Sequence, residues 1–564
     1  MVHIPHLAVV NKSGSFIRIL KSSIMKKIKI PIFQNWLRAS LKWLVISLLF
    51  VLSVVSCTIN KPTFPVAIFP KEMPKIPEPD AAAAQVPAGY KVEVFMKDLI
   101  WPSSIDFDES GNVYVSEAGY VYGDPSAPTQ ILRITPNGQI TRYAEGFHGP
   151  ITDILWHKGQ LYVSHRGKIS TVASNGDVQD IVTGLPSYGD HFNNQMTIGP
   201  DGKLYFGQGT ATNSGVVGLD NAYPYVWLLL HPDVYDVPAS DMRLRGESFL
   251  TPQPNNVLSR QGKLLSLGRN VSYAVNSIFN RNKSKSLLVR TRAFQPFGER
   301  ARNVKGQVKA NGTILRMNTD GSGLEVYASG LRNPYGVKWG PDGQLYVSDN
   351  AYDQRGSRPI ANAKDNIFQI KQGGWYGFPD YSSGIPVTDP QFRPDRGPRP
   401  KLLMANHPPV EQPWLVRPLN AAATKFDFST NASFGFKGHM FLAEFGSATP
   451  LTGDPNLNGY TVSRIDPATK ETQPFLSNKS LGPTGKEYVM TAGPRHPVQA
   501  KFSPDGNALY VVDIGALSIE LGGAGPFPLP SPGTGVIWRI TKQGTNTSSP
   551  PANLSPMPPK TNPK

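Results

Sequence analysis

The sequence predicts an all-β fold, a six-bladed β-propeller of four-stranded antiparallel blades. A strand–turn–strand pattern returns six times along the chain. A second strand pair follows several of the copies, which gives the four strands of a propeller blade. Gly and Pro each occur 53 times among the 564 residues, and both residue types interrupt helices.

The six copies share an apolar-alternating strand, a tight turn and a second strand ending in a small or acidic residue. They begin at Pro102, Pro150, Asn193, Asn333, Ala422 and His496. Pro-Asp-Gly supplies the turn in several copies, because its Gly adopts positive φ without strain. The alternation of apolar with polar residues predicts strands with one buried face. Stretches such as QILRITPNGQITRYAEG, from residue 130, supply the second strand pair.

The repeats also define the domain limits. We assign residues 1–57 to a signal peptide, 58–87 to a Pro/Ala-rich tether, 88–543 to the propeller and 544–564 to a disordered tail. Residues 211–311 form an insertion directly after the strand pair of the third copy. Because insertions in propellers leave as loops on one face, we expect this segment to wall or cover a central site.

The leader resembles that of a bacterial lipoprotein. An apolar stretch from Leu44 to Val55 follows basic residues and is too short to span a bilayer comfortably. It ends at Val-Val-Ser-Cys, which resembles a lipobox, and Cys57 is the only cysteine in the chain. We therefore expect an extracytoplasmic, membrane-anchored lipoprotein, periplasmic or at the cell surface, with its lipid on Cys57. The alternative is a lone buried cysteine after an uncleaved anchor.

The net charge of +16 is concentrated in two segments. Residues 1–57 hold eight Lys or Arg and no acidic residue, and residues 211–311 hold fourteen Lys or Arg against six Asp or Glu. The rest of the chain is balanced, so the charge does not predict a nucleic-acid partner.

One motif does not recur with the repeats. Asp190 and His191 stand just upstream of the third copy. An imidazole titrates near neutral pH and suits general-base chemistry. The alternative is an ordinary turn, since Gly-Asp-His before a strand is common loop chemistry.

Three stretches together resemble the soluble glucose dehydrogenase and sorbosone dehydrogenase family. They are LPSYGDHFNNQMTIGPDGKLYFGQG, ASGLRNPYGVKWGPDGQLYVSDN and DNIFQIKQGGWYGFP. The resemblance spans roughly residues 88–543. It implies a six-bladed propeller that binds pyrroloquinoline quinone (PQQ) and Ca²⁺, takes a sugar substrate and passes electrons to an external acceptor.

The resemblance also assigns roles to residues. His191 matches the general base that takes the sugar hydroxyl proton, and Asp190 would orient it or raise its basicity. Arg332 matches the arginine that stabilises negative charge on the quinone, and Asn333 the amide that binds the cofactor.

Further matches are less specific. The carbonyl groups of Ala351 and Tyr352 match Ca²⁺ ligands, for which oxygen donors are suitable. Asp365 matches an aspartate of the following loop. His148 stands where the family has a glutamine near the active site, and Arg495 precedes the sixth repeat as a cofactor-binding candidate.

Three charges of the family pattern are missing or moved. The fifth-blade loop EFGSATPLTGDPNLNGYTV has no lysine, Arg495 stands alone where the family has two arginines, and Gly209 replaces an aspartate. Cofactor carboxylates without cationic partners are costly to bury. Arginines of the insertion are candidate replacements: Arg243, Arg245, Arg269 and Arg302.

The leading hypothesis is thus a PQQ-dependent dehydrogenase that oxidises an aldose or sorbosone-like sugar. The first alternative is a non-catalytic surface propeller that binds carbohydrate or protein. The second is a metal-dependent lactonase, because fold alone does not decide between chemistries. Its candidate metal ligands would be Glu117, Asp153, Asn333 and Asp513.

Overall fold

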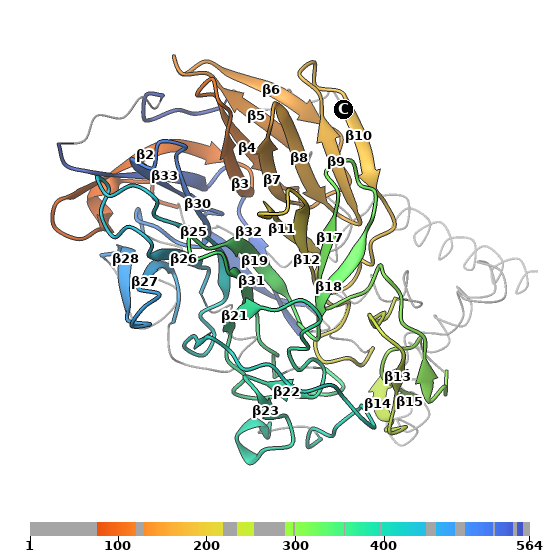
Figure 1. Ribbon diagram of the computed structural model, residues 1–564. Coiled ribbons are helices and arrows are strands. Elements are labelled where there is room, and N and C mark those ends of the chain that lie inside the picture. The colour runs from red at the N-terminus through yellow and green to blue at the C-terminus, as the bar shows by residue number, and fades with distance from the viewer. Residues whose placement is uncertain are drawn as a thin grey trace, which may run out of the picture. The chain divides into compact units, whose positions relative to one another are not determined.

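The computed structural model describes residues 76–119, 129–217, 234–252, 288–296, 299–354, 356–394, 398–446, 458–479, 491–522, 525–544 and 550–556. The predicted signal peptide with Cys57, most of the tether and much of the insertion lie outside these residues. Within the described ranges no helix is long and apolar enough to cross a membrane. The described chain is an all-β propeller of four-stranded antiparallel blades (Figure 1), which confirms the predicted all-β class and the predicted blade type.

The first two blades are formed by consecutive strands. The first contains β3 (Pro102–Phe107), β4 (Val113–Glu117), β5 (Gln130–Ile134) and β6 (Ile140–Glu145). The second contains β7 (Ile151–His157), β8 (Gln160–His165), β9 (Lys168–Val172) and β10 (Val178–Val182). In both sheets the strands pair in chain order, as expected for a blade.

The third blade contains the insertion. It consists of β11 (Asn193–Ile198), β12 (Leu204–Gln208), β17 (Thr313–Met317) and β18 (Glu325–Ser329). The chain leaves after β12 and returns at β17, which pairs with β12 in register. The insertion therefore interrupts the blade after its first strand pair, where the sequence placed it. The next blade is β19 (Pro334–Trp339), β20 (Leu345–Asp349), β21 (Asn366–Ile370) and β24 (Leu415–Val416).

The last two groups of strands belong to one nine-stranded sheet. One group is β25 (Ala423–Phe428), β26 (Met440–Glu444), β27 (Thr461–Ile465) and β28 (Thr472–Asn478), with β1 (Ala84–Gln85) outside it. The other is β29 (Pro497–Phe502), β30 (Ala508–Asp513), β33 (Gly535–Lys542) and β2 (Tyr90–Leu99). The amino-terminal β2 thus completes the sheet that the carboxy-terminal strands begin.

Short elements lie outside the blades. They are η1 (Ala81–Ala83), β13 (Met242–Arg243), β14 (Phe249–Pro252), β15 (Leu288–Thr291), β16 (Asn303–Val304), β22 (Tyr381–Ser382), β23 (Ile385–Pro386), η4 (Pro390–Phe392), β31 (Leu517–Gly522) and β32 (Gly525–Pro530). β13 pairs with β16 and β14 with β15, so the described part of the insertion contains two two-stranded ribbons.

The first strand of each group lies beside the first strand of the next. The contacts run from β3 through β7, β11, β19, β25 and β29, and β29 returns to β3. Their apolar residues pack between neighbouring sheets, as Ile105 does against Tyr510 and Val512 in one cluster. β25 and β29 run parallel, so corresponding residues of these strands lie at the same end of the propeller axis.

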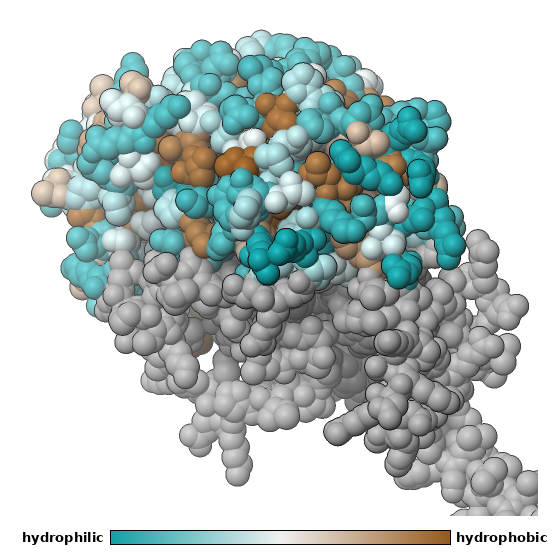
Figure 2. Space-filling model, turned by 90° about the horizontal axis from the view of Figure 1, so that it is seen from below, coloured by the Kyte–Doolittle hydropathy of each residue, from teal (hydrophilic) through white to brown (hydrophobic). Residues whose placement is uncertain are grey.

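Two predicted boundaries were wrong. β1 lies in the predicted tether, yet it pairs with β28. In the predicted disordered tail, the Asn553 and Leu554 N–H groups donate to carbonyl groups of β2, at 2.9 and 3.0 Å. The high Pro content of both segments favoured irregular structure. Each segment nevertheless joins the edge of a sheet, where its backbone groups form hydrogen bonds. The face in Figure 2 shows scattered hydrophobic residues among hydrophilic ones, as is usual for a water-exposed surface.

Candidate active site

A buried polar residue at the end of each second strand marks one end of the propeller. These residues are Glu117, His165, Gln208, Asp349, Glu444 and Asp513. Asp349 shows what such a residue does, because its carboxylate accepts bonds from the backbone N–H groups of Arg332 and Asn333, at 3.0 and 2.7 Å. The residues that lead into β19 are thereby fixed at this end of the axis.

His191 lies at the same end and is partly buried. Its Nδ1 is 2.9 Å from the Thr210 carbonyl oxygen and 3.1 Å from Thr210 Oγ1. A carbonyl oxygen only accepts, so Nδ1 carries a hydrogen. The lone pair of the neutral ring is then on Nε2, the atom that would act as a base. Thr210 thus contacts Nδ1 and orients the ring.

Asp190 is buried, and its backbone N–H donates to the Ala211 carbonyl at 3.1 Å. Its carboxylate influences Asp236, a fully buried residue of the insertion. Burial, and to a lesser degree the charge of Asp190, raises the pKa of Asp236 to about 7.

Arg332 is buried, with its side chain 5% exposed. Nε donates to the Asn213 carbonyl oxygen at 2.9 Å, and Nη2 donates to Asn213 Oδ1 at 2.8 Å. Nη2 also forms an ion pair with Asp353 Oδ2 at 3.2 Å. The guanidinium is therefore held in one orientation by the chain that leaves β12.

His191, Asn333 and Gly209 lie together. A Cβ built on Gly209 would collide with the Cβ of His191 and would lie 3.0 Å from Asn333 Oδ1. The absence of a side chain at position 209, which the sequence showed as a departure from the family, allows this close approach. Asn333 Oδ1 accepts a bond from Asn194 at 2.9 Å, and its Nδ2 donates to Asn350 Oδ1 at 3.0 Å.

Arg166 is a residue that the sequence analysis missed. It is buried, and its guanidinium lies 5.3 Å from the ring centroid of Phe192, the neighbour of His191. Its backbone N–H donates to the His148 carbonyl at 3.1 Å. Its place in the repeat could have identified it: Arg166 directly follows β8, just as Gly209, a residue beside His191, directly follows β12. His148 itself is exposed, with its ring 6.4 Å from that of Tyr188.

Arg495 occupies in its blade the position of Arg332. Its backbone N–H donates to Asp513 at 2.7 Å, and Nη2 donates to the carbonyl groups of Pro77 and Thr491, at 2.8 and 2.6 Å. Burial lowers the pKa of Arg495. Its buried Nε has no hydrogen-bond partner among the described residues. Arg495 is therefore tied to the amino-terminal segment and keeps one donor for a further acceptor.

The predicted Ca²⁺ ligands follow β20. The Ala351 N–H donates to Asp365 Oδ1 at 2.8 Å, and Tyr352 packs on Phe378 with ring centroids 5.9 Å apart. Asp365 also accepts from the Ala423 N–H at 2.8 Å, and burial raises its pKa to about 6. Asp365 therefore fixes the backbone whose carbonyl groups were predicted to bind the ion.

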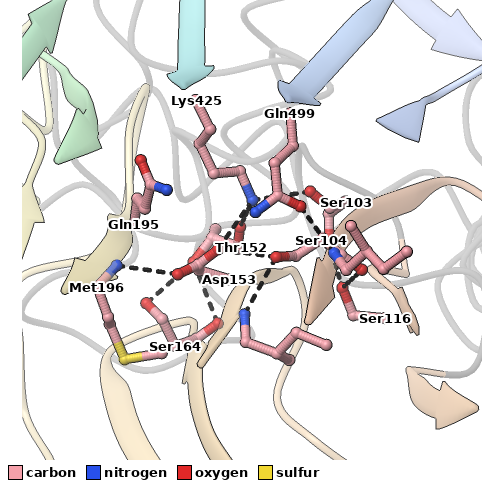
Figure 3. Close-up of polar contacts among 12 residues, drawn as sticks. Ser103, Ser104, Ser116, Thr152, Asp153, Ser164, Gln195, Met196, Lys425 and Gln499 are labelled. Carbon is pink, nitrogen blue, oxygen red and sulfur yellow. Dashed lines mark hydrogen bonds and ion pairs between the residues drawn. The ribbon is translucent and has the colours of Figure 1, made fainter. Parts of the chain in front are cut away.

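Below the site, a polar network crosses the axis (Figure 3). Lys425 Nζ lies 3.1 Å from Asp153 Oδ1 and donates to the carbonyl groups of Ser103 and Thr152, at 2.7 Å each. The Asp153 carboxylate also accepts from Ser104 Oγ at 2.8 Å. These residues come from β25, β3 and β7, so the network ties blades that are distant in sequence.

A cavity of about 350 Å³ lies further along the same strands, away from His191. Two ion pairs line it, Lys501 with Asp106 at 2.9 Å and Lys338 with Asp427 at 3.2 Å. Its charged groups are therefore already paired with each other, and it is not the site built around His191.

The residues proposed for a lactonase metal have other partners. Asp153 pairs with Lys425, Glu117 accepts from the Ile100 N–H at 2.6 Å, and Asp513 holds the backbone before β29. In the described ranges no group of three or more His, Cys, Asp or Glu is arranged to hold a metal.

The arginines proposed as replacements lie within the insertion. Arg243, Arg245 and Arg302 are exposed, and Arg245 Nε donates to the Met404 carbonyl at 2.8 Å. Arg269 lies outside the described residues. The buried arginines at the site are instead Arg166 and Arg332.

Fold and site define a propeller with a partly buried histidine and buried arginines at one end. Residues 294–449 match the family model described as glucose / sorbosone dehydrogenase. The predicted resemblance to this family is thus confirmed over these residues. No curated protein matches the chain.

Similar solved structures include three that align over most of the chain. The PQQ domain of pyranose dehydrogenase from Coprinopsis cinerea is 16% identical, with a TM-score of 0.46, covering 83% of this chain and 99% of that one. A Trichoderma reesei carbohydrate-active enzyme of family AA12 is 16% identical, with a TM-score of 0.47 and coverages of 83% and 100%. PQQ-bound aldose sugar dehydrogenase from Streptomyces coelicolor is 16% identical, with a TM-score of 0.40 and coverages of 81% and 99%.

Proposed function

We propose that this protein is a PQQ-dependent sugar dehydrogenase that oxidises an aldose or a sorbosone-like sugar. The observation that carries the proposal is the position of Thr210 between His191 and Arg332. Its carbonyl oxygen accepts from His191 Nδ1 at 2.9 Å, and its N–H donates to the Arg332 carbonyl at 2.9 Å. The His191 ring and the Arg332 backbone thus both contact Thr210, at one end of the propeller.

The residues present fit the cofactor. PQQ carries three carboxylates, which need cationic partners when they are buried. Arg166, Arg332 and Arg495 are buried at the starts or ends of the inner strands. The Nε of Arg495, which has no hydrogen-bond partner in the described part of the chain, is a donor of the required kind. The carbonyl groups of Ala351 and Tyr352 are hard oxygen donors that suit Ca²⁺.

When bound, PQQ would supply the acceptor for the hydride that leaves the sugar carbon. His191 Nε2 takes the proton of the sugar hydroxyl, because Nδ1 is already protonated and bound to Thr210. The Thr210 carbonyl then stabilises the imidazolium that forms. Arg332 contributes a fixed positive charge where negative charge develops. An external acceptor would then take up the electrons.

The test is a cofactor titration of the full-length protein in detergent. PQQ and Ca²⁺ are added, and the quinone absorbance and aldose-dependent dye reduction are recorded. We expect binding in the micromolar range and dye reduction that requires both additions. Lack of PQQ binding at these concentrations contradicts the proposal. That result favours the alternative of a carbohydrate- or protein-binding surface propeller, which the lack of a lysine in the fifth-blade loop supports.

We also propose that the mature chain is a lipoprotein anchored through Cys57, and therefore extracytoplasmic. The lipobox-like sequence and the short apolar stretch before it support this location. Metabolic labelling with a radioactive fatty acid tests it. Label is expected in the wild-type protein and is lost in Cys57→Ala, whereas equal labelling of both contradicts the proposal.

A further inference from the structure

We propose that the loop leading from β12 into the insertion acts as a strap that positions His191 and Arg332 together, and that Asp236 holds this strap in place. The strap is defined as residues 210–214. The inference rests on the proposed function, because that function gives His191 and Arg332 their roles. It gives the insertion a role in positioning these two residues, and this role does not depend on the basic charge of the insertion.

The strap is buried although it is a polar loop. Thr210, Thr212, Asn213 and Ser214 are each 0% exposed. A loop with no access to water must find partners for its polar groups within the protein. Those partners are the site residues on one side and the insertion on the other.

One half of the strap holds the histidine. The His191 N–H and His191 Nδ1 both donate to the Thr210 carbonyl, at 3.1 and 2.9 Å. Thr210 Oγ1 lies 3.1 Å from the same Nδ1 and donates to the Thr212 carbonyl at 2.7 Å. The imidazole therefore depends on the position of Thr210, and Thr210 depends on Thr212.

The other half holds the arginine. Asn213 offers Arg332 two acceptors, its carbonyl oxygen and its Oδ1, at 2.9 and 2.8 Å. Asn213 Nδ2 donates to the Asp353 carbonyl, and the Asp353 N–H donates back to Asn213 Oδ1, both at 2.9 Å. Any movement of the strap would displace the imidazole and the guanidinium together.

Asp236, a residue of the insertion, binds the strap through hydrogen bonds. Its Oδ1 accepts from the Ala211 N–H at 2.7 Å and from the Thr212 N–H at 3.3 Å. Its Oδ2 accepts from the Thr212 hydroxyl. Asp236 is 0% exposed, so these three donors would be left in a buried site without it. Asp236 touches the strap and is therefore a positioning residue.

The experiment reads the tautomer of His191 in the full-length protein without PQQ or sugar. Histidine is labelled with ¹⁵N, and the signal of His191 is assigned by its loss in His191→Gln. The nitrogen shifts report whether Nδ1 or Nε2 carries the hydrogen of the neutral ring. The wild-type protein is expected to show the Nδ1–H form.

Three variants complete the design. In Asp236→Ala the ratio of Nδ1–H to Nε2–H tautomer should fall about tenfold, because the buried donors lose their acceptor. Asp236→Asn keeps an oxygen for the two N–H groups and should stay near wild type. Asp241→Ala removes an exposed carboxylate of the same insertion, whose side chain is 66% exposed and pairs with Lys305, and should change nothing.

The outcomes separate this inference from the proposed function. A wild-type tautomer ratio in Asp236→Ala overturns the strap, whether or not the protein oxidises sugars. A shifted ratio in a protein that binds no PQQ supports the strap and contradicts the dehydrogenase. If Asp236→Ala does not fold, Thr212→Val removes the hydroxyl bond to Asp236 together with the acceptor of the Gly215 N–H, and an unchanged ratio in that variant also overturns the strap.

Discussion

Lys425 and Asp153 meet on the propeller axis, with Nζ 3.1 Å from Oδ1 and both side chains almost fully buried. They come from β25 and β7, which are more than 250 residues apart in the chain. Burial lowers the pKa of Lys425, while the Asp153 carboxylate opposes this shift. The ion pair is thus a link across the centre of the fold (Figure 3).

Removal of one member of this pair is expected to destabilise the protein strongly. Lys425→Met leaves the Asp153 carboxylate buried without its cation, which costs about 3–5 kcal/mol. The double variant Lys425→Met with Asp153→Leu should recover much of this loss. Urea unfolding measures both effects, and a loss below about 1 kcal/mol in the single variant would contradict a structural role for the pair.

Acid is expected to destabilise the protein through His165. Burial lowers the pKa of His165 to about 4, while the unfolded chain has an ordinary histidine. Between about pH 6.5 and 4 the unfolded state therefore binds more protons, and stability falls as pH falls through this window. From pH 7 to 5 the contribution is about 1–2 kcal/mol.

His165→Gln tests this origin, because its amide can still donate to Ser170 Oγ, which lies 2.7 Å from His165 Nε2. Unfolding free energies are compared at pH 7 and pH 5. The variant should lose less stability on acidification than the wild type. Equal losses in the two proteins would exclude His165 as the source.

The orientation of Arg332 matters more than its charge. Arg332→Lys keeps the charge but cannot span both oxygen atoms of Asn213. We expect kcat/KM for sugar oxidation to fall about 100-fold. Arg142→Lys, at a surface pair with Glu145, is the matched control and should have wild-type activity. Normal kcat/KM in Arg332→Lys would show that a point charge is sufficient.

Position 209 is expected to accept only glycine. In Gly209→Ala the new Cβ meets the Cβ of His191 and lies 3.0 Å from Asn333 Oδ1, so the histidine must move. Because a small displacement of a reacting group is costly, kcat should fall about tenfold or more. Steady-state kinetics measures this change. Wild-type kcat would mean that His191 tolerates the displacement.

The repeats made the fold predictable, since each copy carries its own alternation and its own turn. They also brought His191 and Arg332 to the same end, because both stand just before a first strand. Arg166 had the corresponding place after a second strand, and the repeat contained that signal. The hydrogen-bond partners of these residues could not be predicted from the sequence. Asp236 reaches Thr212 through a fold of the insertion that no local pattern encodes.

The variant His191→Gln tests most directly whether His191 is the base of a PQQ-dependent oxidation. The wild type and this variant are loaded with PQQ and Ca²⁺, and cofactor affinity and aldose-dependent turnover are measured together. We expect unchanged PQQ affinity and a loss of about 10²–10⁴ in kcat. Full turnover in a His191→Gln protein that binds PQQ normally would contradict it.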